Sequence, residues 1–193
     1  MNRKEFLQNT FKGAAVGLII PHFSELLPTH VGQEKPAEKP AGQLSRSDLI
    51  VAAREIIASQ QYCALITQDE QGRSQARTVN PFPPDENMIV WIATSTLTHK
   101  VQQIRHDSRV TLYYADHAKA TGYVAISGTA VLVDDRAEMI KRKRAYWDTA
   151  FPGFKNLVLI KVIPEHLDVL NYSRGAQNDP VTWHAPSVEF KKD

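Results

Sequence analysis

The sequence is poor in several residue types and motifs on which whole classes of protein depend. Its 193 residues include one cysteine, Cys63, so neither a disulfide within the chain nor a cysteine-based metal site can form. The histidines are scattered without the spacing of metal ligands, so no metal site is predicted. Positive residues exceed negative ones by only two (23 against 21), an excess too small to indicate nucleic-acid binding.

Two nucleotide-binding signatures and a membrane span are also missing. The sequence contains neither G-x-G-x-x-G nor G-x-x-x-x-G-K-[S/T], so neither a Rossmann nor a P-loop site is predicted. The apolar stretch at residues 13–20 is much shorter than the roughly 20 residues that a transmembrane helix needs. A stable membrane span is therefore not expected.

The amino-terminal residues have the pattern of an export signal. Residues 2–8 resemble the twin-arginine motif with Lys4 in place of the second arginine, and residues 13–20 suit the apolar region of a signal peptide. Residues 1–27 are therefore predicted to be a twin-arginine-type signal segment that directs the protein to the periplasm. The alternative is a short amphipathic helix on the body of a cytoplasmic protein. Residues 28–44, rich in Pro, Gly, Glu and Lys, are predicted to be a flexible linker.

The next residues alternate between helical and strand patterns. Apolar residues at helical spacing predict a helix over residues 47–60. The predicted strands of this half are 62–67, 74–79, 88–93 and 110–114, with a short helix over 101–106 between the last two. Cys63 lies in the first of these strands and is expected to be a small buried hydrophobic residue.

The second half of the chain continues the strand pattern. A long strand is predicted at 123–133, where Gly128 marks a bulge or a close backbone approach. A helix capped by Asp134 is predicted over 135–147, and its basic run 141–144 is interpreted as a solvated face. A strand at 156–163 is expected to end at Pro164, and 166–172 form one more strand. Residues 173–193 carry no strong pattern and are predicted to be a C-terminal tail.

Short turns join most of these strands, and strands joined in this way pair antiparallel. An antiparallel set of about six strands commonly closes into a barrel, which removes the exposed edges. Residues 45–172 are therefore predicted to form one mostly-β domain, an antiparallel barrel with flanking helices.

The connection between residues 93 and 100 is a candidate anion-binding site. Residues 94–98 include four hydroxyl side chains, and His99 and Lys100 follow where a helix would begin. A helix N-terminus offers unpaired N–H groups and a partial positive charge. Together with Lys100 and the hydroxyls, this arrangement suits a phosphate monoester. The alternative is that Thr96 or Thr98 only caps the helix and that Lys100 is a solvated surface charge.

The order of elements, with three particular segments, resembles the pyridoxamine 5′-phosphate oxidase-like superfamily of flavin-binding split barrels, and most closely its general stress protein-type branch. The first segment is Arg77-Thr78-Val79, and the second runs from Ala93-Thr94-Ser95 to His99-Lys100. The third combines Gly128 and residues 134–136 with Trp147 and the run Phe151-Pro152-Gly153.

The resemblance implies a split β-barrel homodimer with FMN at the interface. Arg77 and Lys100 would hold the flavin phosphate, with His99 where the oxidases usually have arginine. Tyr123 falls where the oxidases often have glutamine, and Trp147 and Phe151 would lie close to the flavin of the same or the partner subunit. The remaining implied residues, which would line the isoalloxazine and ribityl groups, are Thr78, Val79, Ala93, Thr94 and Ser95.

Three functions are compatible with this resemblance. The first is an FMN-dependent oxidoreductase acting on a small molecule, the second a general stress flavin-binding carrier without turnover, and the third a haem-binding split barrel. The arginine- and histidine-bearing C-terminal motif of true pyridoxamine phosphate oxidases has no match in residues 170–193. Oxidation of vitamin B6 is therefore not the expected reaction.

Overall fold

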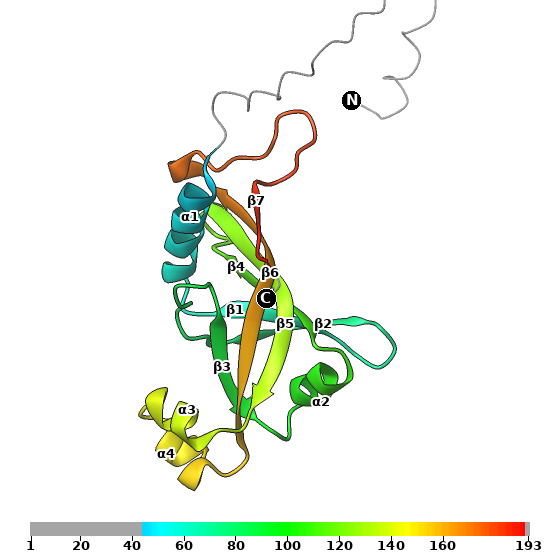
Figure 1. Cartoon of the computed structure of the whole chain (residues 1–193), viewed down its shortest axis with the longest axis vertical. Coiled ribbons are helices and arrows are strands. Elements are labelled where there is room, and N and C mark those ends of the chain that lie inside the picture. Colours follow the sequence, from blue (N-terminus) through cyan, green and yellow to red (C-terminus); the bar gives the residue numbers. More distant parts are fainter. Residues whose placement is uncertain (1–43, 192–193) are drawn as a thin grey trace, which may run out of the picture. The chain divides into compact units, whose positions relative to one another are not determined.

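The computed structural model describes residues 44–191, so the predicted signal segment (1–27) and residues 28–43 of the predicted linker lie outside the described residues. The elements in chain order are α1 (Arg46–Ala58), β1 (Cys63–Gln68), β2 (Ser74–Val79), β3 (Val90–Ser95), α2 (His99–His106), β4 (Arg109–Ala115), β5 (Gly122–Val133), α3 (Arg136–Lys141), α4 (Trp147–Ala150), η1 (Pro152–Phe154), β6 (Leu157–Asn171), η2 (Tyr172–Arg174) and β7 (Ser187–Glu189). Figure 1 shows α1 along the upper part of the sheet, and α2 and α3–α4 on different sides of its lower part.

The sheet is antiparallel throughout, with strand order β2-β1-β4-β5-β6-β3 and β7 beside β6. The two edge strands are joined just beyond the end of β2. There, Pro81 bridges Ile92 of β3, and the Phe82 N–H donates to the Trp91 carbonyl at 2.8 Å. This link brings the two edges of the sheet together, which confirms the predicted antiparallel split β-barrel with flanking helices.

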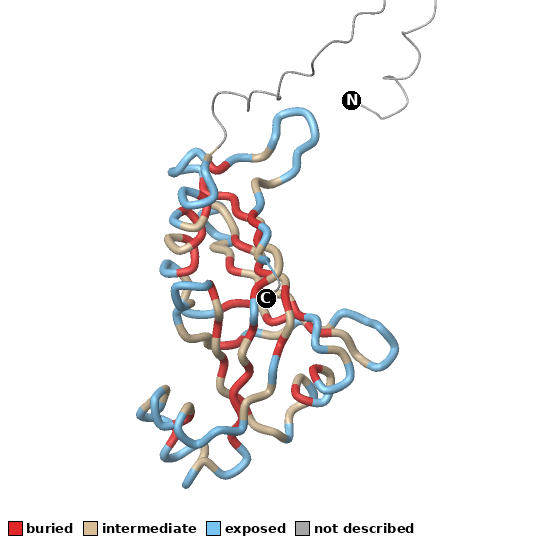
Figure 2. The backbone as a smooth tube through the Cα atoms, viewed as in Figure 1, coloured by how far each residue is buried: buried red, intermediate tan, exposed pale blue. Residues whose placement is uncertain are grey.

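The core lies between the inner face of the barrel and α1. Along β1, β3 and β4, buried residues alternate with half-buried ones, as expected of strands with one buried face. Helix α1 begins at a capping box in which the Ser45 and Asp48 side chains each accept a backbone N–H. Helix α1 then buries an apolar stripe against this core. In Figure 2, the buried residues accordingly lie through the middle of the sheet and along α1.

Strand β6 corrects the prediction of two strands separated at Pro164. It is one continuous strand, and Pro164 pairs with Gly128 where the register of β5 and β6 shifts. A proline lacks the N–H for a regular ladder bond but is tolerated at a bulge. A Cβ on Gly128 would lie 2.0 Å from the Ile163 carbonyl oxygen, so Gly128 marks both a bulge and a close approach.

The predicted helix over 135–147 is wrong as a single element. Asp135, not Asp134, is the N-cap of α3, which ends at Lys141, and α4 begins only at Trp147. In the break, the Arg142 guanidinium lies 3.8 Å from the Trp91 ring centroid, and Arg144 lies 4.0 Å from that of Phe82. The basic run is therefore not a uniformly solvated face, because two of its members pack on aromatic rings of the barrel.

Part of the predicted C-terminal tail belongs to the sheet. Val188 of β7 is buried against the core, and Ala176 is also buried. The imidazole of His166 on β6 bonds Glu189 of β7 at 2.5 Å and Asp168 at 2.9 Å. Among residues 44–191, no helix is both long and apolar enough to span a bilayer.

Candidate anion-binding site

The connection from β3 to α2 places the predicted hydroxyl-rich segment at a helix N-terminus. Thr98 occupies the N-cap position, but its hydroxyl donates to the Ser95 carbonyl at 2.9 Å and does not cap the helix. The expected alternative role for Thr98 as a side-chain cap is therefore wrong. The Val101 N–H donates to the Thr98 carbonyl at 3.0 Å, and the N–H groups of His99 and Lys100 precede it in the first turn of α2, where a helix offers no carbonyl of its own.

Lys100 is a half-buried cation and not a solvated surface charge. Its Nζ donates to the hydroxyl of Thr94, which is itself buried, at 3.0 Å. Burial lowers the pKa of Lys100, and the nearby positive charge of Arg77 lowers it further. The structure therefore brings Lys100, Thr94 and Arg77 together, although they come from three different elements.

Arg77 projects from β2 and is bound only by neutral acceptors. Its Nη1 donates to the Leu65 carbonyl at 3.2 Å and to the Thr67 hydroxyl at 2.7 Å. Its Nη2 donates to the Gln103 side-chain oxygen at 2.7 Å. Burial lowers the pKa of the Arg77 guanidinium, and none of these partners carries a negative charge that would oppose this shift.

Arg77 and Lys100 thus form a pair of half-buried positive charges that repel each other. Within residues 44–191, neither of them takes part in an ion pair. Holding two such charges out of water is unfavourable unless an anion compensates them. Lys100 lies in the first turn of α2, where the partial positive charge of a helix N-terminus also favours an anion. We refer to Arg77, Lys100, Thr94 and the N-terminus of α2 as the anion site.

His99, the first residue of α2, is exposed. It lines a cavity of about 300 Å³ together with Gln102 and Gln103 of the same helix and Gln75 of β2. His99, which stands where the oxidases are expected to have arginine, therefore lies beside the anion site and is open to solvent.

The predicted residues on β2 and β3 face different surroundings. Val79 is buried in the main core, whereas Thr78 is exposed. Ser95 ends β3, and its hydroxyl accepts the Leu97 N–H at 3.2 Å. Ala93 packs on a second group of apolar residues, which we call the aromatic cluster. This cluster consists of Phe82, Trp91, Ala93, Val133, Met139, Trp147, Phe151, Phe154, Leu157 and Leu159.

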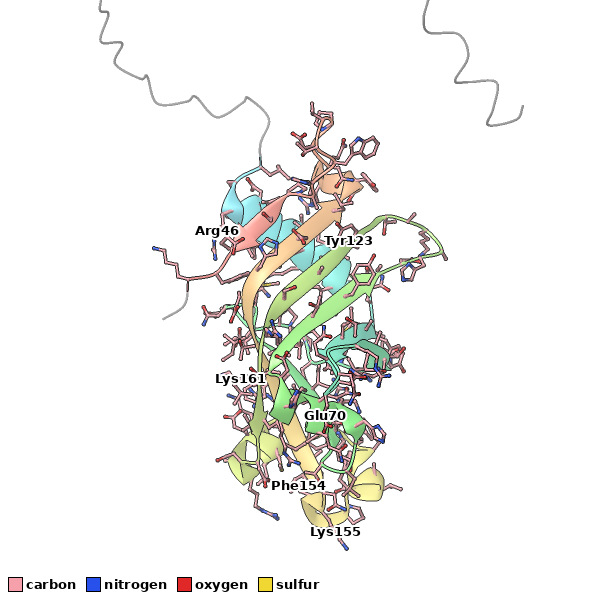
Figure 3. The ribbon with its side chains drawn as sticks, turned by 90° about the vertical axis from the view of Figure 1, so that its right-hand side faces the viewer. Arg46, Glu70, Tyr123, Phe154, Lys155 and Lys161 are labelled. Carbon is pink, nitrogen blue, oxygen red and sulfur yellow. The ribbon has the colours of Figure 1, made fainter. Side chains whose placement is uncertain are left out.

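Trp147 and Phe151 belong to the aromatic cluster. Trp147 has no exposed surface, and its ring meets those of Phe82, Phe151 and Phe154 edge to face, with centroids 6.3–6.4 Å apart. Tyr123 lies elsewhere, with its ring centroid 5.5 Å from that of Tyr113. Figure 3 shows Tyr123 and Phe154 towards opposite ends of the sheet. A single protomer therefore does not gather Tyr123 and Trp147 around one point.

Sequence reasoning missed Thr67 and Gln103, which bind Arg77. Thr67 is fully buried on β1, on the same face as Leu65 and Cys63. A polar residue at one of the alternating buried positions of a strand is a sequence signal that could have identified Thr67 as a site residue. Cys63 is buried as expected, and burial raises the pKa of its thiol to about 12. Gln103 lies one turn after Lys100 on α2, a spacing that places both side chains on the same helix face.

Comparison with known proteins agrees with the fold and the resemblance. A model of the family described as "Pyridoxamine 5′-phosphate oxidase like" matches residues 48–176. No curated protein matches the chain.

Solved structures are similar in fold at low sequence identity. A Clostridium acetobutylicum protein related to general stress protein 26 of B. subtilis (pyridoxinephosphate oxidase family) has a TM-score of 0.60 at 17% identity, covering 76% of this chain and 96% of that one. General stress protein 26 from Bacillus anthracis has a TM-score of 0.55 at 20% identity, with coverages of 62% and 92%. A heme binding protein from Mycobacterium smegmatis has a TM-score of 0.52 at 14% identity, with coverages of 66% and 55%.

Proposed function

Because the chain belongs to the pyridoxamine 5′-phosphate oxidase-like family, we propose that it binds FMN and acts as a flavin-dependent oxidoreductase on a small molecule. The observation that carries this proposal is a pair of uncompensated cations, Lys100 in the first turn of α2 and Arg77 beside Gln103 of the same helix. Two charged donors and unpaired backbone N–H groups fit a phosphate monoester.

The residues of the anion site would bind and orient the flavin phosphate, while the redox chemistry would be supplied by the flavin. Thr94 would orient Lys100, since it bonds the ammonium group directly. His99 would remain a solvent-side neighbour of the site.

A homodimer with FMN between its subunits is part of the proposal. Small side chains of the outer sheet surface, such as Ala76 and Thr78 of β2, are exposed in one protomer. A second copy would cover such a surface, and it would allow Tyr123 and Trp147 to approach one flavin from different subunits. Light scattering at micromolar concentration should give the mass of a dimer, and a monomer would contradict this part.

The function is tested by the absorption spectrum and by ligand titration of the purified full chain. Flavin bands, and tighter binding of FMN than of riboflavin, are expected, because riboflavin lacks the phosphate. Bleaching of the flavin by NADH or NADPH would support an oxidoreductase, and flavin bands without any turnover would favour a carrier. A Soret band in place of flavin bands would overturn FMN binding in favour of haem, the ligand of the mycobacterial structural neighbour.

Export through the twin-arginine route remains a proposal as well. This route carries folded proteins, so it would suit a protein that acquires a noncovalent flavin in the cytoplasm. Fractionation of the native host should place the protein in the periplasm. An entirely cytoplasmic protein with residues 1–20 intact would contradict the proposal.

A further inference from the structure

The Arg77 guanidinium is part of a closed ring of hydrogen bonds. Nη1 donates to the Thr67 hydroxyl at 2.7 Å, and Nη2 donates to Gln103 Oε1 at 2.7 Å. The Thr67 hydroxyl in turn donates to the same Gln103 oxygen at 2.6 Å. A guanidinium group only donates, so Gln103 must present its oxygen and not its NH₂ group to Arg77. The chemistry of Arg77 therefore fixes the orientation of both neighbours.

The ring occupies one edge of the planar guanidinium group, the edge between Nη1 and Nη2. Arginine has five N–H donors. Three of them are in use, because Nη1 also donates to the Leu65 carbonyl. The two that remain are the Nε–H and the second Nη2–H. They point the same way from the adjacent edge, and within residues 44–191 neither has an acceptor.

Two parallel N–H groups on one edge of an arginine match two oxygens of one phosphate group. We propose that Thr67 and Gln103 are positioning residues that hold Arg77 by one edge and present the other edge to the phosphate of the ligand. This inference rests on the proposed FMN site. We call the pair the Thr67–Gln103 clamp.

Both members of the clamp are neutral, and this neutrality matters for binding. A glutamate at position 103 could accept the same two bonds but would pair with Arg77 and cancel its charge. The amide accepts the bonds and leaves the charge available to an anion. Thr67 has no exposed surface and lies on β1, so it fixes the clamp to the core of the barrel. Gln103 and Lys100 share α2, so the same helix that supplies one cation also orients the other.

The clamp is tested with Gln103→Glu against the matched control Gln102→Glu. Gln102 is the exposed neighbour of Gln103 on α2, so its variant makes the same charge change without touching Arg77. FMN and riboflavin are titrated into the full chain by flavin fluorescence. Gln103→Glu should weaken FMN binding about tenfold or more. It should leave riboflavin binding unchanged, whereas Gln102→Glu should keep the FMN preference of the wild type. A merely structural role of Gln103 would weaken both ligands together.

A second set of variants tests whether the remaining edge of the Arg77 guanidinium, with its two parallel N–H groups, binds the phosphate. Arg77→Lys keeps the positive charge but cannot offer two parallel donors, so it should lose most of the preference for FMN over riboflavin. Thr67→Val, which lacks the hydroxyl, should reduce the preference for FMN over riboflavin. Thr67→Ser, which keeps the hydroxyl, should retain the preference of the wild type. Thermal unfolding of each variant verifies that it is folded.

The outcomes separate the clamp from the function on which it rests. If the wild type prefers FMN but Gln103→Glu behaves like Gln102→Glu, the clamp is wrong and the FMN site stands. If the wild type shows no preference for FMN over riboflavin, both are overturned. Loss of the preference in Gln103→Glu and Arg77→Lys, with retention in Gln102→Glu and Thr67→Ser, would establish the clamp.

Discussion

The anion site and the aromatic cluster lie around the same strand, β3, and use positive charges in opposite ways. In the anion site, Lys100 and Arg77 bond only neutral atoms and have no negative partner among the described residues. At the aromatic cluster, Arg142 forms an ion pair with Glu138 and lies over the Trp91 ring. Arg144 lies over Phe82 and donates to the carbonyls of Asn80 and Pro81.

This contrast indicates which charges serve the fold and which await a ligand. A cation over an aromatic face, with its donors occupied, stabilises the folded chain by itself. A pair of half-buried cations that repel each other opposes folding until an anion binds. The same residue types therefore predict different phenotypes: loss of stability on one side of β3 and loss of affinity on the other.

The largest expected effect is on the aromatic cluster. Trp147→Ala should lower the free energy of unfolding by about 3–5 kcal/mol, because it empties a fully buried site ringed by Phe82, Phe151 and Phe154. Urea unfolding followed by circular dichroism measures this change. The control is Trp183→Ala, since Trp183 is 75% exposed and its loss should change stability by no more than about 0.5 kcal/mol. Equal effects of the two variants would contradict the assigned role of the cluster.

The next effect is on ligand affinity at the anion site. Lys100→Ala removes a charged hydrogen bond worth roughly 1.5–3 kcal/mol, so FMN affinity should fall by about 10–150-fold. Stability should not fall in parallel, because the repulsion between Lys100 and Arg77 is relieved. Fluorescence titration gives the affinity, with Arg105→Ala as a control from the exposed side of α2. Unchanged FMN affinity in Lys100→Ala would remove Lys100 from the site.

A smaller effect on stability is expected at Arg144, which lies at the aromatic cluster. Arg144→Gln loses the contact with Phe82 and the bonds to two carbonyls, and it should lower the free energy of unfolding by about 1–2 kcal/mol. FMN affinity should remain that of the wild type. Lys141→Gln, an exposed residue of the same basic run, is the matched control and should leave stability unchanged. A loss of FMN affinity in Arg144→Gln would contradict the proposal that Arg144 serves stability and not ligand binding.

The smallest effect is a pH dependence of opposite sign for stability and binding. The pKa of Lys100 in the folded chain lies below its ordinary value. Between these two pKa values, Lys100 binds more protons in the unfolded chain than in the folded chain. The contribution of Lys100 to stability without ligand should therefore rise as the pH rises through its folded pKa. FMN affinity should fall over the same range, because the neutral amine no longer attracts the phosphate. Lys100→Ala should remove the Lys100 component of both trends, and their persistence in that variant would assign them to another group.

Local sequence patterns predicted most of the elements, and they failed where distant residues decide. The short turns and alternating strands of the first half were sufficient to predict α1 and β1 to β4 within a few residues. Pro164 predicts the end of a strand, but β6 continues through it, because the bulge at Gly128 on the neighbouring strand tolerates a proline there. In the break between α3 and α4, Arg142 and Arg144 pack on Trp91 and Phe82, which lie far away in the chain.

For the site, the sequence by itself determined the charged groups, because Arg77 and Lys100 stand in recognisable local patterns on a strand and at a helix start. The tertiary structure alone decided how these groups are held. Gln102 and Gln103 are the same residue type at adjacent positions, and only the packing of α2 turns Gln103 toward Arg77 and leaves Gln102 exposed. Hydrogen bonds of this kind join β1, β2 and α2, and their short range requires that folding first bring these elements together.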